Sequence, residues 1–326
     1  MRRSIRLAVC FAALLAATAS AESLEELLAR SEAIYATGRF EEAIAILQAR
    51  LEAPEPDDNL IPVRGTLGDI YLEMAKPDKA LEQFDEIAAE HPRYARAHYK
   101  RGRALEQLAR FLEAIDAYAL AGEQLYDEAE IRGRIGFNYS LLANLPETAT
   151  ADRRRYAELA RKSLTRAIQL DPSNLSAMGN LADIHFNLGE FQLALDYYER
   201  MDRMESSRPM TLARIGSAYL KLEQCKPAVE NLLRAAEILA ASKPRTRTDA
   251  QVHRDVEVFA RVRAAECLIA LDRAAEARSQ ISRVLEIANC TDCATASREV
   301  DRSKLRAEEL LLQLDAVSAA NAEATR

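Results

Sequence analysis

Three glycines lie 34 residues apart in this chain, at Gly68, Gly102 and Gly136. A second series of small residues keeps the same step, at Ala160, Ala194 and Ala228. A self-similarity of this length is typical of stacked helix pairs, in which each pair packs only on its neighbours. The sequence therefore predicts an all-α fold, a right-handed α-solenoid, and a protein that binds rather than one that catalyses.

The amino terminus has the composition of a secretory signal peptide over residues 1–21. Three arginines among the first six residues precede a short apolar run from Ile5 to Ala17, and small residues follow at 19–21. We expect cleavage after Ala21, with Ala19 as the alternative. The apolar run is shorter than the roughly 20 residues that a membrane-spanning helix needs, so an uncleaved anchor is the less favoured interpretation. The expected location is the periplasm or the extracellular space.

The charge of the chain argues against polyanionic partners. The formal charge is -7, and removal of a leader with three arginines and no acidic residue leaves the mature part at -10. Nucleic acid and anionic membranes are therefore not expected partners. No alternating, strand-like segment of any length occurs in the sequence. One elongated domain over residues 22–318, without a membrane-spanning segment, is predicted.

The repeating unit is clearest in residues 175–208, where two helix-periodic segments meet at Gly189. Ala182 in the first segment and Ala194 in the second are small enough to let the two helices approach closely. The order of a small residue, a glycine, an aromatic residue, an alanine and a second aromatic residue resembles the tetratricopeptide repeat family. The resemblance implies about seven helix-turn-helix units that bind a protein or peptide partner.

The repeat arithmetic also predicts boundaries and interruptions. The predicted units lie near residues 24–57, 61–94, 95–128, 129–174, 175–208, 209–242 and 258–291. Twelve extra residues are expected near 144–155, inside the fourth unit, and fifteen near 243–257, where they could lengthen helices. A capping helix over 297–316 and a flexible tail over 319–326 complete the prediction.

The sequence offers little support for catalysis. The four histidines include no pair at metal-ligand spacing, and no phosphate-binding or nucleophile motif is present. His98 and His185 occupy unit positions that normally hold a packing aromatic residue. We therefore expect no enzyme activity, no cofactor and no metal.

The cysteines leave two questions open. Cys290 and Cys293 are close enough in sequence to bridge each other, as a structural disulfide or as a redox-active pair. Cys225 and Cys267 are expected on the core side of adjacent units, either as buried free thiols or as a second bridge. An oxidising compartment would favour disulfides.

The resemblance implies that the first helix of each unit lines a concave groove that holds a partner segment. The predicted groove residues are Arg96, Tyr99, Lys100, Arg103, Arg134, Phe137, Asn180, Phe186, Asn187, Arg214, Lys221 and Arg263. Cations dominate this set, which favours an acidic partner segment; the alternative is that these cations pair with neighbouring acids.

The predicted function is thus a non-catalytic interaction scaffold of the cell envelope. A redox-responsive or enzyme-accessory protein that uses Cys290 and Cys293 is one alternative, and a subunit of a secretion or polysaccharide-export assembly is another. The sequence specifies neither the identity of the partner nor the oligomeric state.

Overall fold

Helices joined by short connections make up the part of the chain that the structure describes. The structure is a computed structural model that describes residues 22–54, 59–124, 127–289 and 297–324. The predicted leader over 1–21 and the pair Cys290 and Cys293 lie outside the described residues. Within those ranges the chain is an all-α repeat solenoid without strands. No helix in them is both long enough and apolar enough to cross a membrane.

The structure divides into two compact units, one ending at Pro172 and the other beginning at Ser173. This differs from the single predicted domain over 22–318. Each helix pair in a solenoid packs only on its neighbours, so an array can divide wherever one pair ends. The division falls just before the fifth predicted unit, which starts at Leu175.

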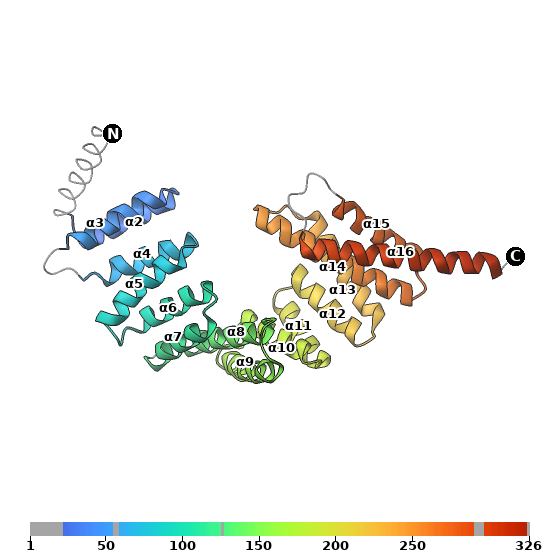
Figure 1. Cartoon of the computed structure of the whole chain (residues 1–326), viewed down its shortest axis with the longest axis horizontal. Coiled ribbons are helices and arrows are strands. Elements are labelled where there is room, and N and C mark those ends of the chain that lie inside the picture. The colour runs from blue at the N-terminus through green and yellow to red at the C-terminus, as the bar shows by residue number, and fades with distance from the viewer. Residues whose placement is uncertain (1–21, 55–58, 125–126, 290–296, 325–326) are drawn as a thin grey trace, which may run out of the picture. The chain divides into compact units, whose positions relative to one another are not determined.

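The described part of unit 1 contains four helix pairs. They are α2 (Leu24–Ala36) with α3 (Phe40–Glu52), α4 (Ile61–Glu73) with α5 (Pro77–Glu90), α6 (Ala95–Gln107) with α7 (Phe111–Glu123), and α8 (Glu128–Asn144) with α9 (Thr150–Leu170). We call α2, α4, α6 and α8 first helices, and their partners second helices. Each helix packs against the next one along the chain (Figure 1).

Unit 2 consists of three helix pairs and a final helix. They are α10 (Leu175–Asn187) with α11 (Phe191–Met204), α12 (Pro209–Lys221) with α13 (Cys225–Ala241), and α14 (Arg247–Ala270) with α15 (Ala274–Ala288), followed by α16 (Arg298–Ala324). The first helices here are α10, α12 and α14. Helix α16 packs against α14 and α15 (Figure 1).

The repeated glycines mark the places where the two helices of a pair come closest. A Cβ atom added at Gly102 would lie 2.7 Å from the buried ring of Tyr118, which is too close for any real Cβ contact. The same relation recurs in other pairs, between Gly68 and Phe84, Gly136 and Leu164, and Gly216 and Leu232. The 34-residue step therefore records one packing contact between first and second helices.

The turn between the helices of most pairs contains a residue in the left-handed region. Gly38 has a φ of 81° and Gly189 a φ of 82°, which glycine adopts without strain. Four other pairs place a residue with a side chain there, with φ between 53° and 60°: Ala75, Ala109, Glu223 and Asp272. The turn geometry is thus kept by the packing of the pair even where glycine is absent.

The two insertions lengthen helices. Helices α8 and α9 contain 17 and 21 residues, and α13 and α14 contain 17 and 24, whereas α6 and α7 contain 13 each. The twelve residues near 144–155 thus leave only residues 145–149 as a connection. The predicted start of the seventh unit at Val258 is wrong by eleven residues, because α14 begins at Arg247. A capping box formed by Thr246 and Asp249 sets that earlier start.

The last helix is longer than predicted. Helix α16 covers Arg298–Ala324, so the predicted flexible tail over 319–326 is wrong for the residues up to Ala324. The alanine-rich composition of this end has high helix propensity, which favours the longer helix. Val300, Ala307, Leu310 and Leu314 are buried in the core of unit 2, as expected of a helix that covers the end of an array.

Candidate partner-binding clefts

The predicted groove residues all lie on first helices. Those of unit 1 come from α6 and α8, and those of unit 2 from α10, α12 and α14. The sequence therefore assigned these side chains to the correct kind of helix. What the structure adds is the set of contacts that each one makes.

Three of the predicted groove cations bind a carboxylate on the preceding first helix. The pairs are Lys100 with Asp69 at 2.6 Å, Arg134 with Glu106 at 3.3 Å, and Arg214 with Asp183 at 2.8 Å, measured from nitrogen to oxygen. These ion pairs link one helix pair to the next, so the cations have a role in stacking the array.

Sequence spacing carried a signal for these ion pairs. Asp69 precedes Lys100 by 31 residues, and Asp183 precedes Arg214 by the same number. That interval is one repeat less three residues, which brings the two side chains together across neighbouring first helices. A search for acids 31 residues before groove bases would have identified both pairs.

A hydrogen-bonded network occupies the first-helix face of unit 1. The Tyr99 hydroxyl donates to Glu130 Oε1 at 2.8 Å, and Arg134 Nε donates to the same oxygen at 2.8 Å. Burial, together with this bond to Glu130, raises the pKa of Tyr99 to about 12. The Tyr118 hydroxyl donates to Glu106 Oε2 at 3.0 Å. Predicted groove residues Tyr99 and Arg134 are therefore held rigidly by neighbouring acids.

The remaining predicted residues are less constrained. Arg263 pairs with Glu266 on its own helix at 2.9 Å and lies over the Phe259 ring, with 5.5 Å from its guanidinium carbon to the ring centroid. Three cations form no ion pair with another described residue: Arg96, Arg103 and Lys221. Phe137 and Asn180 are half-buried, whereas Asn187 is exposed.

One cleft lies between α2, α4 and α6 in unit 1 and has a volume of about 310 Å³. It brings together the predicted residues Arg96 and Lys100 with Asp69, Ile61 and Tyr94. Lys100 and Asp69 neutralise each other, and the lining also contains Glu32 as well as Arg96, so the formal charges of this cleft balance.

A second cleft lies between α10, α12 and α14 in unit 2 and has a volume of about 340 Å³. We call it the apolar cleft. Its apolar lining consists of Phe186, Met210, Ala213, Val256 and Phe259, and its polar lining of Asp183, Tyr198, Arg214, Ser217, Asp255 and Glu299. Two predicted groove residues, Phe186 and Arg214, thus meet here.

The polar groups at the edge of the apolar cleft are held by one another. Asp183 accepts hydrogen bonds from Arg214 at 2.8 Å and from the Tyr198 hydroxyl at 2.5 Å. Burial raises the pKa of Asp183, and these two partners oppose that shift. Asp255, another residue of the lining, accepts from Gln251 at 2.8 Å and from the Ser297 hydroxyl. A ligand would therefore meet preorganised polar groups around an apolar floor.

Sequence reasoning missed four apolar residues of this cleft: Met210, Ala213, Val256 and Phe259. Met210 and Phe259 occupy the second position of the sixth and seventh predicted units, a position already used to assign Arg96 to the groove. Extending the same rule to apolar side chains would have found both. Val256 lies in the predicted insertion near residues 243–257, outside the predicted repeats. Only the structure places it in the cleft.

The groups that could carry other chemistry have structural partners. Among the described residues, no cluster of three or more histidine, cysteine, aspartate or glutamate side chains could hold a metal ion. His98 Nε2 donates to the carbonyl oxygen of Pro92 at 2.8 Å, and His185 Nδ1 lies 2.5 Å from a Glu190 carboxylate oxygen. Cys225 and Cys267 form a disulfide between α13 and α14, which answers the question that the sequence left open.

Solved structures share the fold. A tetratricopeptide repeat protein from Parabacteroides merdae is 12% identical, with 87% of this chain and 98% of that chain covered and a TM-score of 0.58. PilW, described as a type IV pilus biogenesis factor, is 15% identical over 75% of this chain and 98% of its own, with a TM-score of 0.56. PilF of Pseudomonas aeruginosa is 18% identical over 70% and 94%, with a TM-score of 0.52. No curated protein gives a significant match.

The family assignment is supported by sequence as well as by fold. A tetratricopeptide repeat family model matches residues 66–130 and 150–209, which contain helices of both units. These segments include the close contact of Gly102 with Tyr118. Proteins of such repeats use their extended surfaces to bind other proteins, so an interaction scaffold is the class of function that this fold supports. Over these two segments the chain matches the tetratricopeptide repeat family.

Proposed function

We propose that this protein is a non-catalytic interaction scaffold of the cell envelope, and that its apolar cleft holds apolar side chains of a partner segment. The observation that carries this proposal is the apolar cleft itself. Concave sites with an apolar floor and a few ordered polar groups are the usual form of binding sites in proteins. Transfer of apolar surface out of water would supply most of the binding free energy.

The polar groups of the cleft suit a peptide. Arg214 carries donors in the cleft lining, and Asp183 and Asp255 carry acceptors. The Ser217 hydroxyl donates to the Ala213 carbonyl oxygen at 2.7 Å and can still accept a hydrogen bond. An extended backbone has unpaired donors and acceptors along its length, and burial without partners is costly. The edge groups would meet that need while the floor receives a side chain.

Charge has a smaller role in this cleft than the sequence predicted. Arg214 is already paired with Asp183, and both Asp255 and Glu299 add negative charge. Acidic residues of a partner would instead find cations without ion pairs at Arg96, Arg103 and Lys221. We therefore propose apolar anchoring as the main source of affinity at the apolar cleft.

Two observations support the proposed location outside the cytoplasm. The first is the leader-like composition of residues 1–21, and the second is the disulfide between Cys225 and Cys267. Structural disulfides are common in exported proteins and rare in the cytosol. Fractionation of cells into cytoplasm and envelope, with sequencing of the mature amino terminus, tests this part of the proposal.

A matched pair of methionines tests the binding site. Met210 lies in the apolar cleft and is 41% exposed, whereas Met204 lies outside it on α11 and is 43% exposed. A photo-crosslinking residue at position 210 should capture a partner in intact cells, and the same residue at position 204 should not. In purified protein, Met210→Arg should weaken binding of that captured partner by at least about tenfold, because it places a charge on the apolar floor.

The control for folding is Met204→Arg, which adds the same charge at equal exposure. Both variants should keep the helical circular dichroism of the parent protein. Equal capture at the two positions, or equal loss of affinity in the two arginine variants, would refute the assignment of the apolar cleft as the binding site.

A further inference from the structure

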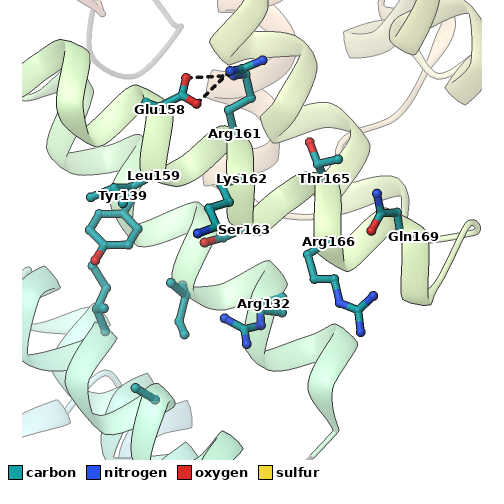
Figure 2. A pocket seen from close by; sticks show the side chains of 13 residues that line it. Arg132, Tyr139, Glu158, Leu159, Arg161, Lys162, Ser163, Thr165, Arg166 and Gln169 are labelled. Carbon is teal, nitrogen blue, oxygen red and sulfur yellow. Dashed lines mark hydrogen bonds and ion pairs between the residues drawn. The ribbon is translucent and has the colours of Figure 1, made fainter.

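A larger cleft, separate from the apolar cleft and on different helices, lies between α7, α8 and α9 of unit 1. Its volume is about 820 Å³, and side chains of α8 and α9 line most of it (Figure 2). We call it the basic cleft, after the four cations in its lining: Arg132 from α8, and Arg161, Lys162 and Arg166 from α9. The lining contains one carboxylate, that of Glu158.

Nearby acids do not neutralise these cations. Glu158 forms a two-bond pair with Arg161, at 2.7 and 3.0 Å, which leaves it committed to one partner (Figure 2). Glu128 is shared between Arg166 at 3.2 Å and Arg132 at 3.8 Å. Lys162 forms no ion pair with another residue that the structure describes. Two carboxylates therefore face four cations, and the basic cleft carries an excess of positive charge.

Helix α9 concentrates positive charge in an acidic chain. It contains six basic and two acidic residues, while the whole chain has a formal charge of -7. Arg155, Lys162 and Arg166 are all exposed. At 100° per residue they share one face of the helix, over a length of about 16 Å. The twelve-residue insertion lengthens α9 at its amino end, so it adds Arg155 to the cations that continue from the basic cleft.

The floor between the cations is apolar. Ile115 and Ile135 are buried residues of the lining, and Leu159 and Tyr139 are half-buried there. The Tyr139 ring stacks on Tyr156 with 6.1 Å between centroids, which fixes its orientation. A ligand that fits this lining has negative charges at the rim and an apolar group at the centre.

We propose that the basic cleft docks an acidic segment of a partner protein that carries a bulky apolar side chain among its acidic residues. Screening at physiological salt limits charge effects to about 8 Å, so the local excess decides the attraction of a short segment. An extended polyanion or a membrane surface would also meet the negative remainder of the chain, which disfavours both. This surface and the apolar cleft lie in different units, so either proposal can fail alone.

The test uses the full mature chain and a defined probe. The probe is a fluorescent peptide of glutamates with a single leucine at its centre. Its binding to the protein is measured by fluorescence anisotropy at physiological salt. We expect saturable binding that weakens as salt increases. Lys162→Glu with Arg166→Glu should weaken it by about tenfold or more, because attraction becomes repulsion at two contacts. Met210→Arg, in the apolar cleft, should leave it unchanged.

The matched control is Lys226→Glu with Arg302→Glu, which changes the net charge by the same amount at exposed positions of unit 2. Equal weakening by this control would show a general charge effect and overturn the proposal. Two other results would also overturn it. One is equal binding of a peptide with glutamine in place of glutamate, and the other is binding of anionic lipid vesicles or single-stranded RNA without binding of the acidic peptide.

Discussion

Single glycines decide how closely the helices of a pair approach. Gly102 lies on the ring of Tyr118, which is fully buried and has no room to move. Gly102→Ala should therefore lower the free energy of unfolding by about 1 to 3 kcal/mol, since the new methyl group must displace the ring or separate the helices. Urea denaturation monitored by circular dichroism measures this change.

Gly65 provides the opposite case within the same kind of helix. It lies inside α4, and a Cβ atom there would meet nothing within 4 Å. Gly65→Ala should raise the free energy of unfolding by about 0.5 to 1 kcal/mol, because alanine is the better helix former and the space is free. If both alanine variants shifted stability in the same direction, close packing would not be the reason for the 34-residue glycines.

Ion pairs between neighbouring first helices show a second effect of single residues. The cations expected to attract a partner, such as Lys100 and Arg214, instead bind Asp69 and Asp183 of the preceding pair. Their positions on first helices followed from the sequence, but their partners depended on how neighbouring helices stack. The sequence therefore predicted that these cations lie on first helices. It did not predict whether they remain available to bind a ligand.

At the scale of elements, the disulfide between Cys225 and Cys267 joins the start of α13 to the later half of α14. The two cysteines are 42 residues apart, and closing a loop of this length in the unfolded chain should contribute about 2 to 4 kcal/mol. Adding a reductant should therefore lower the melting temperature of the wild-type protein. The double variant Cys225→Ala with Cys267→Ala should melt at a lower temperature and be insensitive to reductant.

The control for this experiment is a variant of the two cysteines that lie outside the described residues, Cys290 and Cys293. Cys290→Ala with Cys293→Ala leaves the α13 to α14 bridge intact, so its melting temperature should still respond to reductant. A wild-type protein whose melting temperature did not change on reduction would contradict a stabilising bridge between these two helices.

Longer helices explain why interrupted repeats keep their packing. The inserted residues extend α8 and α9 within one pair, and α13 and α14 of two successive pairs, while Gly136 still packs on Leu164 and Gly216 on Leu232. Repeat arithmetic predicted insertions near residues 144–155 and 243–257. Whether they formed loops or helices depended on capping and on tertiary contacts, which the arithmetic does not contain.

At the scale of the whole molecule, each unit contains a buried core cluster of its own residues. Unit 2 contains its own buried cluster, including Leu232, Leu268 and Leu310, and its own disulfide. A fragment of residues 173–326 should therefore fold alone, with a cooperative thermal transition and helical circular dichroism. It should also bind the partner captured through Met210, because every residue of the apolar cleft belongs to this unit.

A fragment with the complementary residues 22–172 provides the comparison. It should bind the acidic peptide of the basic cleft and should not bind the partner captured through Met210. Absence of a cooperative transition in the fragment of residues 173–326 would mean that the units do not fold independently.

The sequence by itself determined the repeat, the helical fold and the location of the groove residues on first helices. These follow from periodicity, which is local and is repeated often enough to be read without contacts. Tertiary structure alone decided the division into two units, the pairing of Arg134 with Glu106, and the lining of the basic cleft. Each of these depends on which side chains meet across helices, and a spacing along the chain does not contain that information until the helices are packed.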